Sequence, residues 1–426
     1  MNSRSSRIFF FVFFMLFISF WFLTSVGSRF ISKTKTTQEW DGTSAISKSE
    51  KNYQKVSLIS KIIKKEAAID KRITIKNSQF YNVVLLTKLI DKYCYNYNLT
   101  TSISNVANDV NIWDDVVVSR DGEMLTYIVD NNDDDYQINA VLDFKKILEN
   151  QYNVPLVIFM PPGKDSGIID DSYLGIYVDN VVSDRRKLIT QLSDAKISFI
   201  DFSEKLEAEG MNEDEIFFRT DHHWLPQAAL MACKELGVYL NTQGFSIDNS
   251  IFDESNYRLE WSDAKMLGTQ GRKATPIYTD YEKLPIIHPL YDSDLTVFNS
   301  KLNATVQGTI EETLFDYSRI VGGNPLRDTR YQFYGYGDRA YIGIHNNLKP
   351  DGKRILVIKE SFADCMIPYM SNMAENIDVI DLRHFKGSLQ SMISKNQPDI
   401  VVMVYGARAF FYSKEVDSTI DPFNFD

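Results

Sequence analysis

Residues 354–364 read Arg-Ile-Leu-Val-Ile-Lys-Glu-Ser-Phe-Ala-Asp, an apolar run of strand length that leads into a serine. Apolar side chains recur at helical spacing over 362–374, so the sequence predicts a buried strand that turns into a helix. The same alternation recurs elsewhere, with strands expected at 155–160, 197–202, 377–382 and 399–405 and helices at 138–152, 181–192, 226–236 and 388–395. Buried strands that alternate with helices form a mainly parallel sheet covered on both faces, so we expect an α/β fold of three layers.

Polar side chains stand where three of these strands end, and in open α/β sheets the chemistry lies at the carboxyl ends of the strands. Ser361 follows strand 354–358, and a serine on a strand-to-helix turn exposes its hydroxyl beside backbone N–H groups that can hold an oxyanion. The alternative for Ser361 is a helix N-cap, a common role of serine at such junctions. Arg383 and Tyr405 end neighbouring strands and could position substrate or donate to the oxyanion, or else be purely structural.

A second polar cluster lies in residues 217–224, which read Phe-Phe-Arg-Thr-Asp-His-His-Trp. A catalytic imidazole needs one nitrogen free to take a proton and the other held by a carboxylate. In extended chain, residues two apart point the same way, so Asp221 and His223 are expected to share a face while His222 points elsewhere. The alternative interpretation of residues 217–224 is a polar turn without catalytic function before the helix expected at 226–236. Trp224 is expected to pack rather than to stack on substrate.

The same side chains raise the question of a metal, because Asp221, His222 and His223 are all metal ligands in other proteins. Adjacent histidines in a strand point to opposite sides, and no HExxH spacing occurs in the chain, so we expect no metal. The three cysteines lie far apart without a CxxC pair, which favours neither a disulfide framework nor a zinc site. We expect one of them, Cys365, to be buried and inert.

The chain of 426 residues has a net charge of −11 that is unevenly distributed. Residues 1–76 carry 14 Lys and Arg against 5 acidic residues, and the remainder carries 32 against 52. A body this acidic repels phosphate, which excludes nucleic acid as a partner.

Residues 8–27 form a stretch of twenty residues without a charge, long enough to span a bilayer as a helix. A secretory signal peptide has a shorter apolar region of roughly 7–15 residues, so an uncleaved signal-anchor is favoured over a cleaved leader. We expect residues 1–27 to be this transmembrane anchor, 28–76 a Lys-rich polar stalk, and 77–426 a body outside the cytoplasmic membrane, at the cell surface or in the periplasm. Within the body, 241–345 breaks the alternation and is interpreted as a long insertion over the site.

The motif at 221–224 before a helix that contains proline, followed far downstream by Lys-Glu-Ser at 359–361, resembles the bacterial family named DHHW after that motif. This family is related to the periplasmic alginate O-acetyltransferases, and the resemblance implies an SGNH-hydrolase-like fold. It covers roughly residues 135–240 and 350–410. Glu360 is a departure, because relatives often have Asp there.

The resemblance implies a Ser-His-Asp triad in which Ser361 attacks an acyl carbonyl, His223 takes its proton and Asp221 holds the imidazole. His222 is the alternative base. The implied function is a membrane-anchored O-acetyltransferase, or the adjacent acetylesterase, that modifies a cell-surface or exported polysaccharide without a cofactor. A multi-spanning membrane acyltransferase would supply the acyl group. The alternative is a non-catalytic protein that keeps the fold and binds glycan or assists assembly.

Overall fold

The computed structural model describes residues 110–113, 116–119, 124–126, 135–164, 181–274, 279–321, 324–325, 328–411 and 421–425. The expected anchor at 8–27 and the stalk at 28–76 lie outside these residues. Within the described ranges, no helix combines the length and the apolar character that a membrane span requires.

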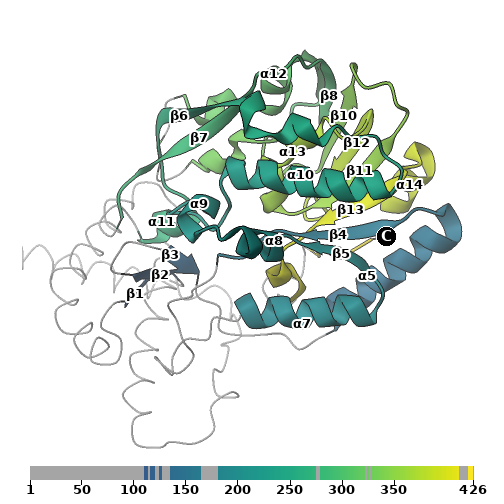
Figure 1. Ribbon diagram of the computed structural model, residues 1–426, viewed down its shortest axis with the longest axis horizontal. Coiled ribbons are helices and arrows are strands. Elements are labelled where there is room, and N and C mark those ends of the chain that lie inside the picture. Colours follow the sequence, from purple (N-terminus) through teal and green to yellow (C-terminus); the bar gives the residue numbers. More distant parts are fainter. Residues whose placement is uncertain are drawn as a thin grey trace, which may run out of the picture. The chain divides into compact units, whose positions relative to one another are not determined.

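The centre of the body is an eight-stranded sheet in the order β5-β4-β13-β11-β12-β10-β8-β9 (Figure 1). Its strands are β4 (Leu156–Met160), β5 (Ser198–Asp201), β8 (Leu295–Asn299), β9 (Ala304–Gly308), β10 (Tyr341–Asn346), β11 (Arg354–Lys359), β12 (Asn376–Ile380) and β13 (Ile400–Val404). The five strands from β5 to β12 are parallel, and β10, β8 and β9 continue the sheet in antiparallel pairing. The predicted mainly parallel sheet is therefore confirmed, with β4, β11 and β13 as neighbours.

Side chains of β11 alternate between two buried clusters, which is the pattern of a strand covered on both faces. Ile355 and Val357 belong to the cluster that contains α10 (Pro226–Thr242) and α13 (Ile367–Met370). Leu356 and Ile358 belong to the cluster on the other face, formed with α5 (Tyr136–Ile147), α7 (Val181–Asp194) and α14 (Leu389–Asn396). These two helical layers and the sheet make the three expected layers (Figure 1).

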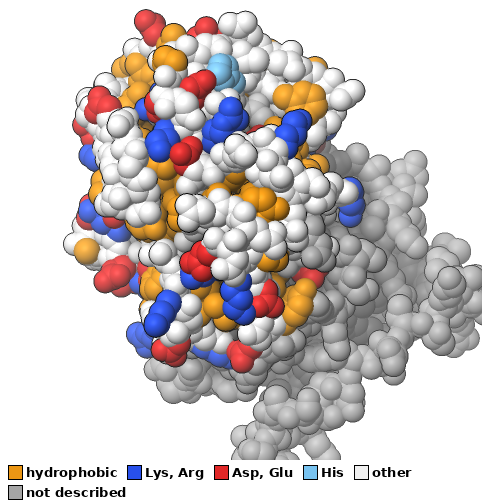
Figure 2. All heavy atoms as spheres, turned by 90° about the vertical axis from the view of Figure 1, so that its right-hand side faces the viewer, with side chains coloured by type: hydrophobic (Ala, Val, Ile, Leu, Met, Phe, Trp, Pro, Cys, Tyr) orange, Lys and Arg blue, Asp and Glu red, His pale blue; other side chains and the backbone are white. Residues whose placement is uncertain are grey.

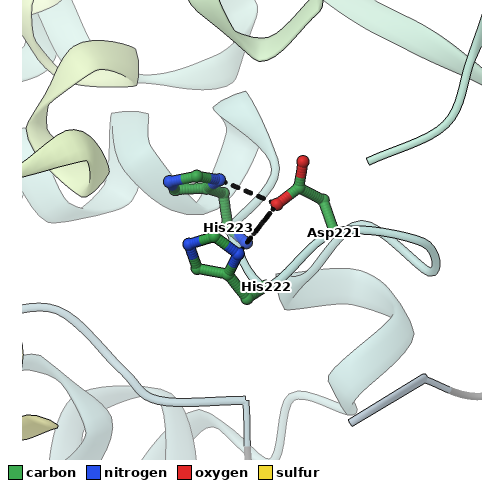
Figure 3. Close-up of side chains that lie close together, drawn as sticks. All are labelled: Asp221, His222 and His223. Atoms are coloured by element: carbon green, nitrogen blue, oxygen red, sulfur yellow. Dashed lines mark hydrogen bonds and ion pairs between the residues drawn. The ribbon is translucent and has the colours of Figure 1, made fainter. Parts of the chain in front are cut away.

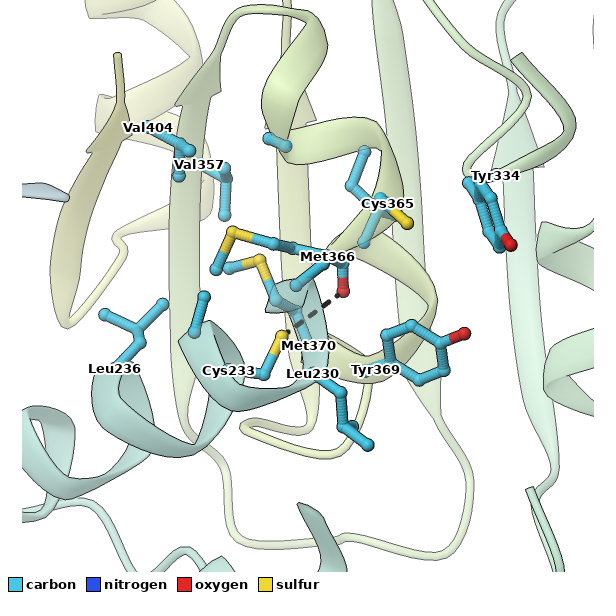
Figure 4. Packing of buried hydrophobic residues seen from close by; sticks show 14 of the residues in the cluster. Leu230, Cys233, Leu236, Tyr334, Val357, Cys365, Met366, Tyr369, Met370 and Val404 are labelled. Atoms are coloured by element: carbon cyan, nitrogen blue, oxygen red, sulfur yellow. Dashed lines mark hydrogen bonds between the residues drawn. The ribbon is translucent and has the colours of Figure 1, made fainter. Parts of the chain in front are cut away.

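Figure 4 shows the packing on the α10 side of this core, where Cys233 and Cys365 both lie. The Cys233 thiol lies 3.6 Å from the backbone carbonyl of Met366, to which it donates. Cys365 is fully buried nearby, and burial raises the pKa of its thiol well above the ordinary value. A neutral, buried thiol is a poor nucleophile, so the structure agrees with an inert Cys365.

The range 241–345 has two parts. Strands β8 to β10 extend the central sheet, whereas β6 (Tyr257–Met266) and β7 (Glu282–Pro289) pair only with each other in a separate antiparallel ribbon. Helix α11 (Thr269–Ala274) lies between β6 and β7 in the chain. A third, small sheet consists of β1 (Val110–Trp113), β2 (Val116–Ser119) and β3 (Met124–Thr126), and α11 contacts β2 and β3.

The helix predicted over 362–374 is wrong as a single element. The chain instead forms a 3₁₀ turn, η8 (Ser361–Cys365), and then the one-turn helix α13. Pro368 explains the break, because proline has no N–H to continue the hydrogen-bond ladder and is tolerated only in a first turn.

The remaining short helices are η3 (Leu148–Tyr152), α8 (Phe202–Glu209), α9 (Glu213–Ile216), η4 (Asn249–Phe252), η5 (Glu254–Asn256), α12 (Ile310–Leu314), η6 (Tyr317–Arg319), η7 (Arg330–Phe333) and η9 (Ala407–Phe411).

On the face presented in Figure 2, Lys and Arg side chains are interspersed with Asp and Glu over the described surface. This face therefore carries charges of both signs and no continuous basic stripe.

Candidate active site

Residues 217–224 form a tight loop that delivers its side chains to the sheet edge. Phe217 and Trp224 make an isolated antiparallel bridge, and the N–H of Phe218 donates to the carbonyl of His223 at 3.1 Å. Pro226 then begins α10, as its preference for a first helical turn predicts. The segment is thus a turn and not an extended strand, so the alternation expected for a strand does not apply to it.

Both imidazoles therefore face Asp221 (Figure 3), and the expectation that His222 points elsewhere is wrong. Oδ1 of Asp221 lies 2.8 Å from Nδ1 of His223 and 3.1 Å from Nδ1 of His222. The two rings are 3.9 Å apart between centroids. Burial works against the charged form of Asp221, but the two imidazoles outweigh it and hold the pKa of this carboxyl well below its usual range. Asp221 is a carboxylate at neutral pH and can accept both N–H groups.

The other ring nitrogen of His223 faces the serine from the far end of the chain. Nε2 of His223 lies 2.8 Å from Oγ of Ser361, although 138 residues separate them. Ser361 is the first residue of η8, two residues after the end of β11, and the N-cap position belongs to Glu360, which makes no side-chain cap. The structure therefore connects Ser361, His223 and Asp221 by two hydrogen bonds, and the N-cap alternative for Ser361 does not hold.

A model of the DHHW family, described as DHHW protein, matches residues 92–380, a range that contains the loop at 221–224 and Ser361. The chain belongs to the DHHW family. No match was found among curated protein sequences.

Solved structures show which fold this DHHW protein shares. A DHHW family protein from Eubacterium siraeum has 18% sequence identity and a TM-score of 0.56, with 72% of this chain and 95% of that chain covered. PatB1 from Bacillus cereus, solved with a sulfonyl adduct, has 19% identity and a TM-score of 0.56, with 74% and 99% covered. The O-acetyltransferase domain of AlgJ from Pseudomonas putida is more distant, with 14% identity, a TM-score of 0.36 and coverage of 74% and 96%.

The second carboxylate oxygen of Asp221 is held by the start of α11, a contact that sequence reasoning missed. The backbone N–H of Thr269 donates to Oδ2 of Asp221 at 3.2 Å. One residue earlier, the N–H of Gly268 donates to Oγ1 of Thr220 at 2.9 Å, and the N–H of Gly271 donates to the Thr220 carbonyl at 2.8 Å. In this DHHW protein, the range 241–345 therefore provides a backbone hydrogen bond that holds the Asp221 carboxylate.

Two buried aromatic side chains, Tyr331 and Trp224, bind the serine turn, and Tyr331 also stacks on His223. The ring of Tyr331 stacks on His223 with centroids 4.0 Å apart and an angle of 11° between planes. The Tyr331 hydroxyl and the Trp224 indole N–H both donate to the backbone carbonyl of Phe362, at 3.2 and 2.9 Å. Because Trp224 is fully buried, it packs as the sequence favours and a substrate-stacking role for it is wrong.

Lys164, four residues after β4, holds the histidine loop from the other side. Its ammonium lies 2.8, 3.0 and 3.3 Å from the backbone carbonyls of Phe218, Arg219 and Asp221, and 3.5 Å from the side-chain oxygen of Gln270. The Lys164 ammonium thus binds three backbone carbonyls of the loop, up to and including that of Asp221, and fixes the loop's path there.

Arg383 takes part in a partly buried ionic network around Lys359, the last residue of β11. Its guanidinium pairs with Asp381 and Asp338, and the ammonium of the fully buried Lys359 pairs with the same two carboxylates and with Asp364. Burial, with Asp338 and Asp381 nearby, outweighs Lys359 and raises the pKa of Asp364 to about 7. Arg383 is therefore engaged with protein carboxylates, which favours its structural alternative.

Tyr405 is buried on the α5 side of the sheet, packed between the rings of Phe410 and Phe423. Its hydroxyl donates to the backbone carbonyl of Pro422 at 2.9 Å. The prediction that Tyr405 contributes to substrate or oxyanion binding is wrong, because at the end of β13 the side chain points into the core and its donor is used there.

Proposed function

We propose that this DHHW protein is a serine-dependent O-acetyltransferase, or the mechanistically adjacent acetylesterase, that acts on a cell-surface or exported polysaccharide. The observation that carries the proposal is the continuous contact from Ser361 Oγ through both nitrogens of His223 to Asp221. Serine is a weak nucleophile at its own pKa and requires an adjacent base, which is what this arrangement supplies.

In the proposed reaction, Oγ of Ser361 forms a bond to the acyl carbonyl carbon while Nε2 of His223 takes the hydroxyl proton. The carboxylate of Asp221 fixes Nδ1–H as the donor and stabilises the imidazolium that forms. The imidazolium returns the proton to the leaving oxygen as the acyl-enzyme forms. A sugar hydroxyl or water then attacks the acyl carbon while His223 takes its proton. The bond from the acyl carbon to Oγ breaks, and the imidazolium returns the proton to Oγ, which regenerates Ser361.

The stacked Tyr331 suits this cycle, because an aromatic face attracts the cation that His223 becomes. The first N–H groups of η8 have no acceptor within a helix and stand beside Ser361, so we assign the developing oxyanion to them. No metal is required for any step.

The site is proposed to work outside the cytoplasmic membrane, with residues 8–27 as the anchor and a multi-spanning acyltransferase as the donor of the acyl group. This extension is supported by the uncharged stretch of twenty residues and the basic tail ahead of it. Protease added to intact spheroplasts should degrade the body; complete protection would contradict this topology.

The decisive experiment is turnover of p-nitrophenyl acetate by the full-length protein, together with labelling by phenylmethanesulfonyl fluoride. Since PatB1 has been solved with a sulfonyl adduct, a sulfonyl reagent is the appropriate probe here. We expect acetate release and a single covalent adduct on Ser361, both lost in Ser361→Ala and both retained in Ser391→Ala, which alters an exposed serine of α14. A protein that binds polysaccharide but shows neither turnover nor labelling would instead be a non-catalytic glycan-binding member of the family.

A further inference from the structure

The loop at 221–223 brings three side chains together in a way that the proposed triad does not need. Asp221, His222 and His223 each offer one ligand atom, and these three atoms all lie within 4.8 Å of one another. A triad uses one imidazole per carboxylate, whereas here two Nδ1 atoms approach the same oxygen (Figure 3). Among the described residues no other group of three His, Cys, Asp or Glu is placed like this.

We propose that Asp221, His222 and His223 form an inhibitory site for Zn²⁺ or a similar divalent transition-metal ion. The donor set, two imidazoles and one carboxylate, suits zinc, copper or nickel and not magnesium or calcium, which prefer oxygen alone. The inhibitory part of the proposal rests on the proposed function, and the binding part does not.

The distances fit such an ion with little movement. At a Zn–N distance of about 2.1 Å, ligand atoms of a tetrahedral site are roughly 3.4 Å apart. The two Nδ1 atoms are 3.1 and 2.8 Å from Oδ1 of Asp221 and at most 4.8 Å from each other, so side-chain shifts of roughly an ångström or less would admit the metal. His222 supplies the entrance, since 31% of its side chain is exposed against 6% for His223 and 1% for Asp221.

Occupancy would stop the serine chemistry through the tautomer of His223. Without metal, Nδ1–H of His223 donates to Asp221, so Nε2 carries the lone pair that faces Ser361. A metal on Nδ1 needs the lone pair there, which moves the ring proton to Nε2. The Nε2–H would then donate to Oγ of Ser361 across the same 2.8 Å and could not accept its proton.

Binding is tested on the full-length Ser361→Ala protein, where catalysis plays no part, by titrating ZnCl₂ in a buffer that does not chelate metal and recording the heat. We expect one stoichiometric site, no binding of MgCl₂ at the same concentrations, and an affinity for zinc at least about tenfold lower when His222→Gln is added. Glutamine keeps an N–H for Asp221 but is a poor zinc ligand, and a melting curve checks that the variant is folded. The matched control is His345→Ala, which removes a more exposed histidine of β10.

Equal zinc affinity with and without His222→Gln would overturn the site. In the wild type, zinc should abolish turnover of p-nitrophenyl acetate and EDTA should restore it; zinc binding that depends on His222 but leaves turnover intact would overturn the inhibition. If the metal-free wild type has no esterase activity, the proposed function fails, while the titration still decides whether the metal site exists.

Discussion

A side chain on Gly268 would collide with Asp221. A Cβ atom built on Gly268 would stand 2.2 Å from Cβ of Asp221 and 2.5 Å from the carbonyl oxygen of Thr220. Real Cβ contacts are never this short, so only glycine lets the start of α11 lie against the carboxylate and present the N–H of Thr269 to it.

Gly268→Ala should therefore displace α11 and remove a hydrogen bond from Asp221. We expect the free energy of unfolding to fall by ~1–3 kcal/mol, as for other overpacked sites, and kcat for p-nitrophenyl acetate to fall at least about tenfold. Gly210→Ala is the control: its φ of +68° makes alanine strained, but nothing lies within 4 Å of the added atom. It should lose similar stability and keep its kcat. Equal kcat values in both variants would show that α11 does not support catalysis.

The triad variants should be strongly non-additive. Ser361→Ala and His223→Ala should each remove most of the esterase activity, and the double variant should lose little more, because the two residues act as one unit. Asp221→Asn should lose comparable or less activity while remaining folded. Activity that survives His223→Ala but not His222→Ala would mean that His222 is the base.

Lys164→Met should loosen the histidine loop, because it leaves the carbonyls of Phe218 and Arg219 without their cation. A cost of ~1–3 kcal/mol in the free energy of unfolding is expected for partners left unsatisfied, accompanied by a lower kcat. Lys205→Met is the matched control, since Lys205 pairs with Glu209 at the surface, a kind of ion pair that contributes about 1 kcal/mol or less. Denaturant titration and steady-state kinetics measure both variants, and identical behaviour would contradict the assigned role.

Asp364→Asn should change how stability depends on pH. Because the pKa of Asp364 is raised to about 7 from its ordinary value of 3.8, the folded protein holds this proton over a range in which the unfolded chain has released it. The raised pKa of this carboxyl therefore lowers the free energy of unfolding of the wild type as pH rises from about 4 to about 7, by up to ~4 kcal/mol. The free energy of unfolding of Asp364→Asn minus that of wild type should increase over this range. Asp143→Asn, which alters an exposed carboxyl of α5, is the control; a pH-dependent difference for Asp364→Asn no larger than that of the control would contradict the shift.

The sheet could be predicted because it follows from local patterns, whereas the pairing of Ser361 with His223 was predicted from the resemblance to the DHHW family. Apolar runs of strand length between helical segments specify a parallel sheet, and a parallel sheet brings its strand ends to one edge. The orientation of His222 was predicted wrongly because the bridge between Phe217 and Trp224 closes a turn that no strand periodicity describes. The prediction for Tyr405 was wrong for a related reason, because a position at a strand end does not determine on which side of the sheet the side chain lies.

The supports of the site could not be found in the sequence. Gly268 and Thr269 act through backbone N–H groups, and Lys164 acts on backbone carbonyls, so no pairing of side-chain types marks them. Tyr331 is one of 23 tyrosines and is distinguished only by its stacking on His223.

The carbonyl of Phe362 has a consequence for how this family can diverge. Trp224, from the loop of the base, and Tyr331, from a segment more than a hundred residues away, both donate to this one main-chain oxygen beside the nucleophile. A main-chain acceptor is present whatever side chain occupies position 362. Mutation at position 362 can therefore change the surroundings of Ser361 for a new substrate while both hydrogen bonds to the main-chain carbonyl remain. Mutation of Trp224 or Tyr331 would instead remove one of these hydrogen bonds.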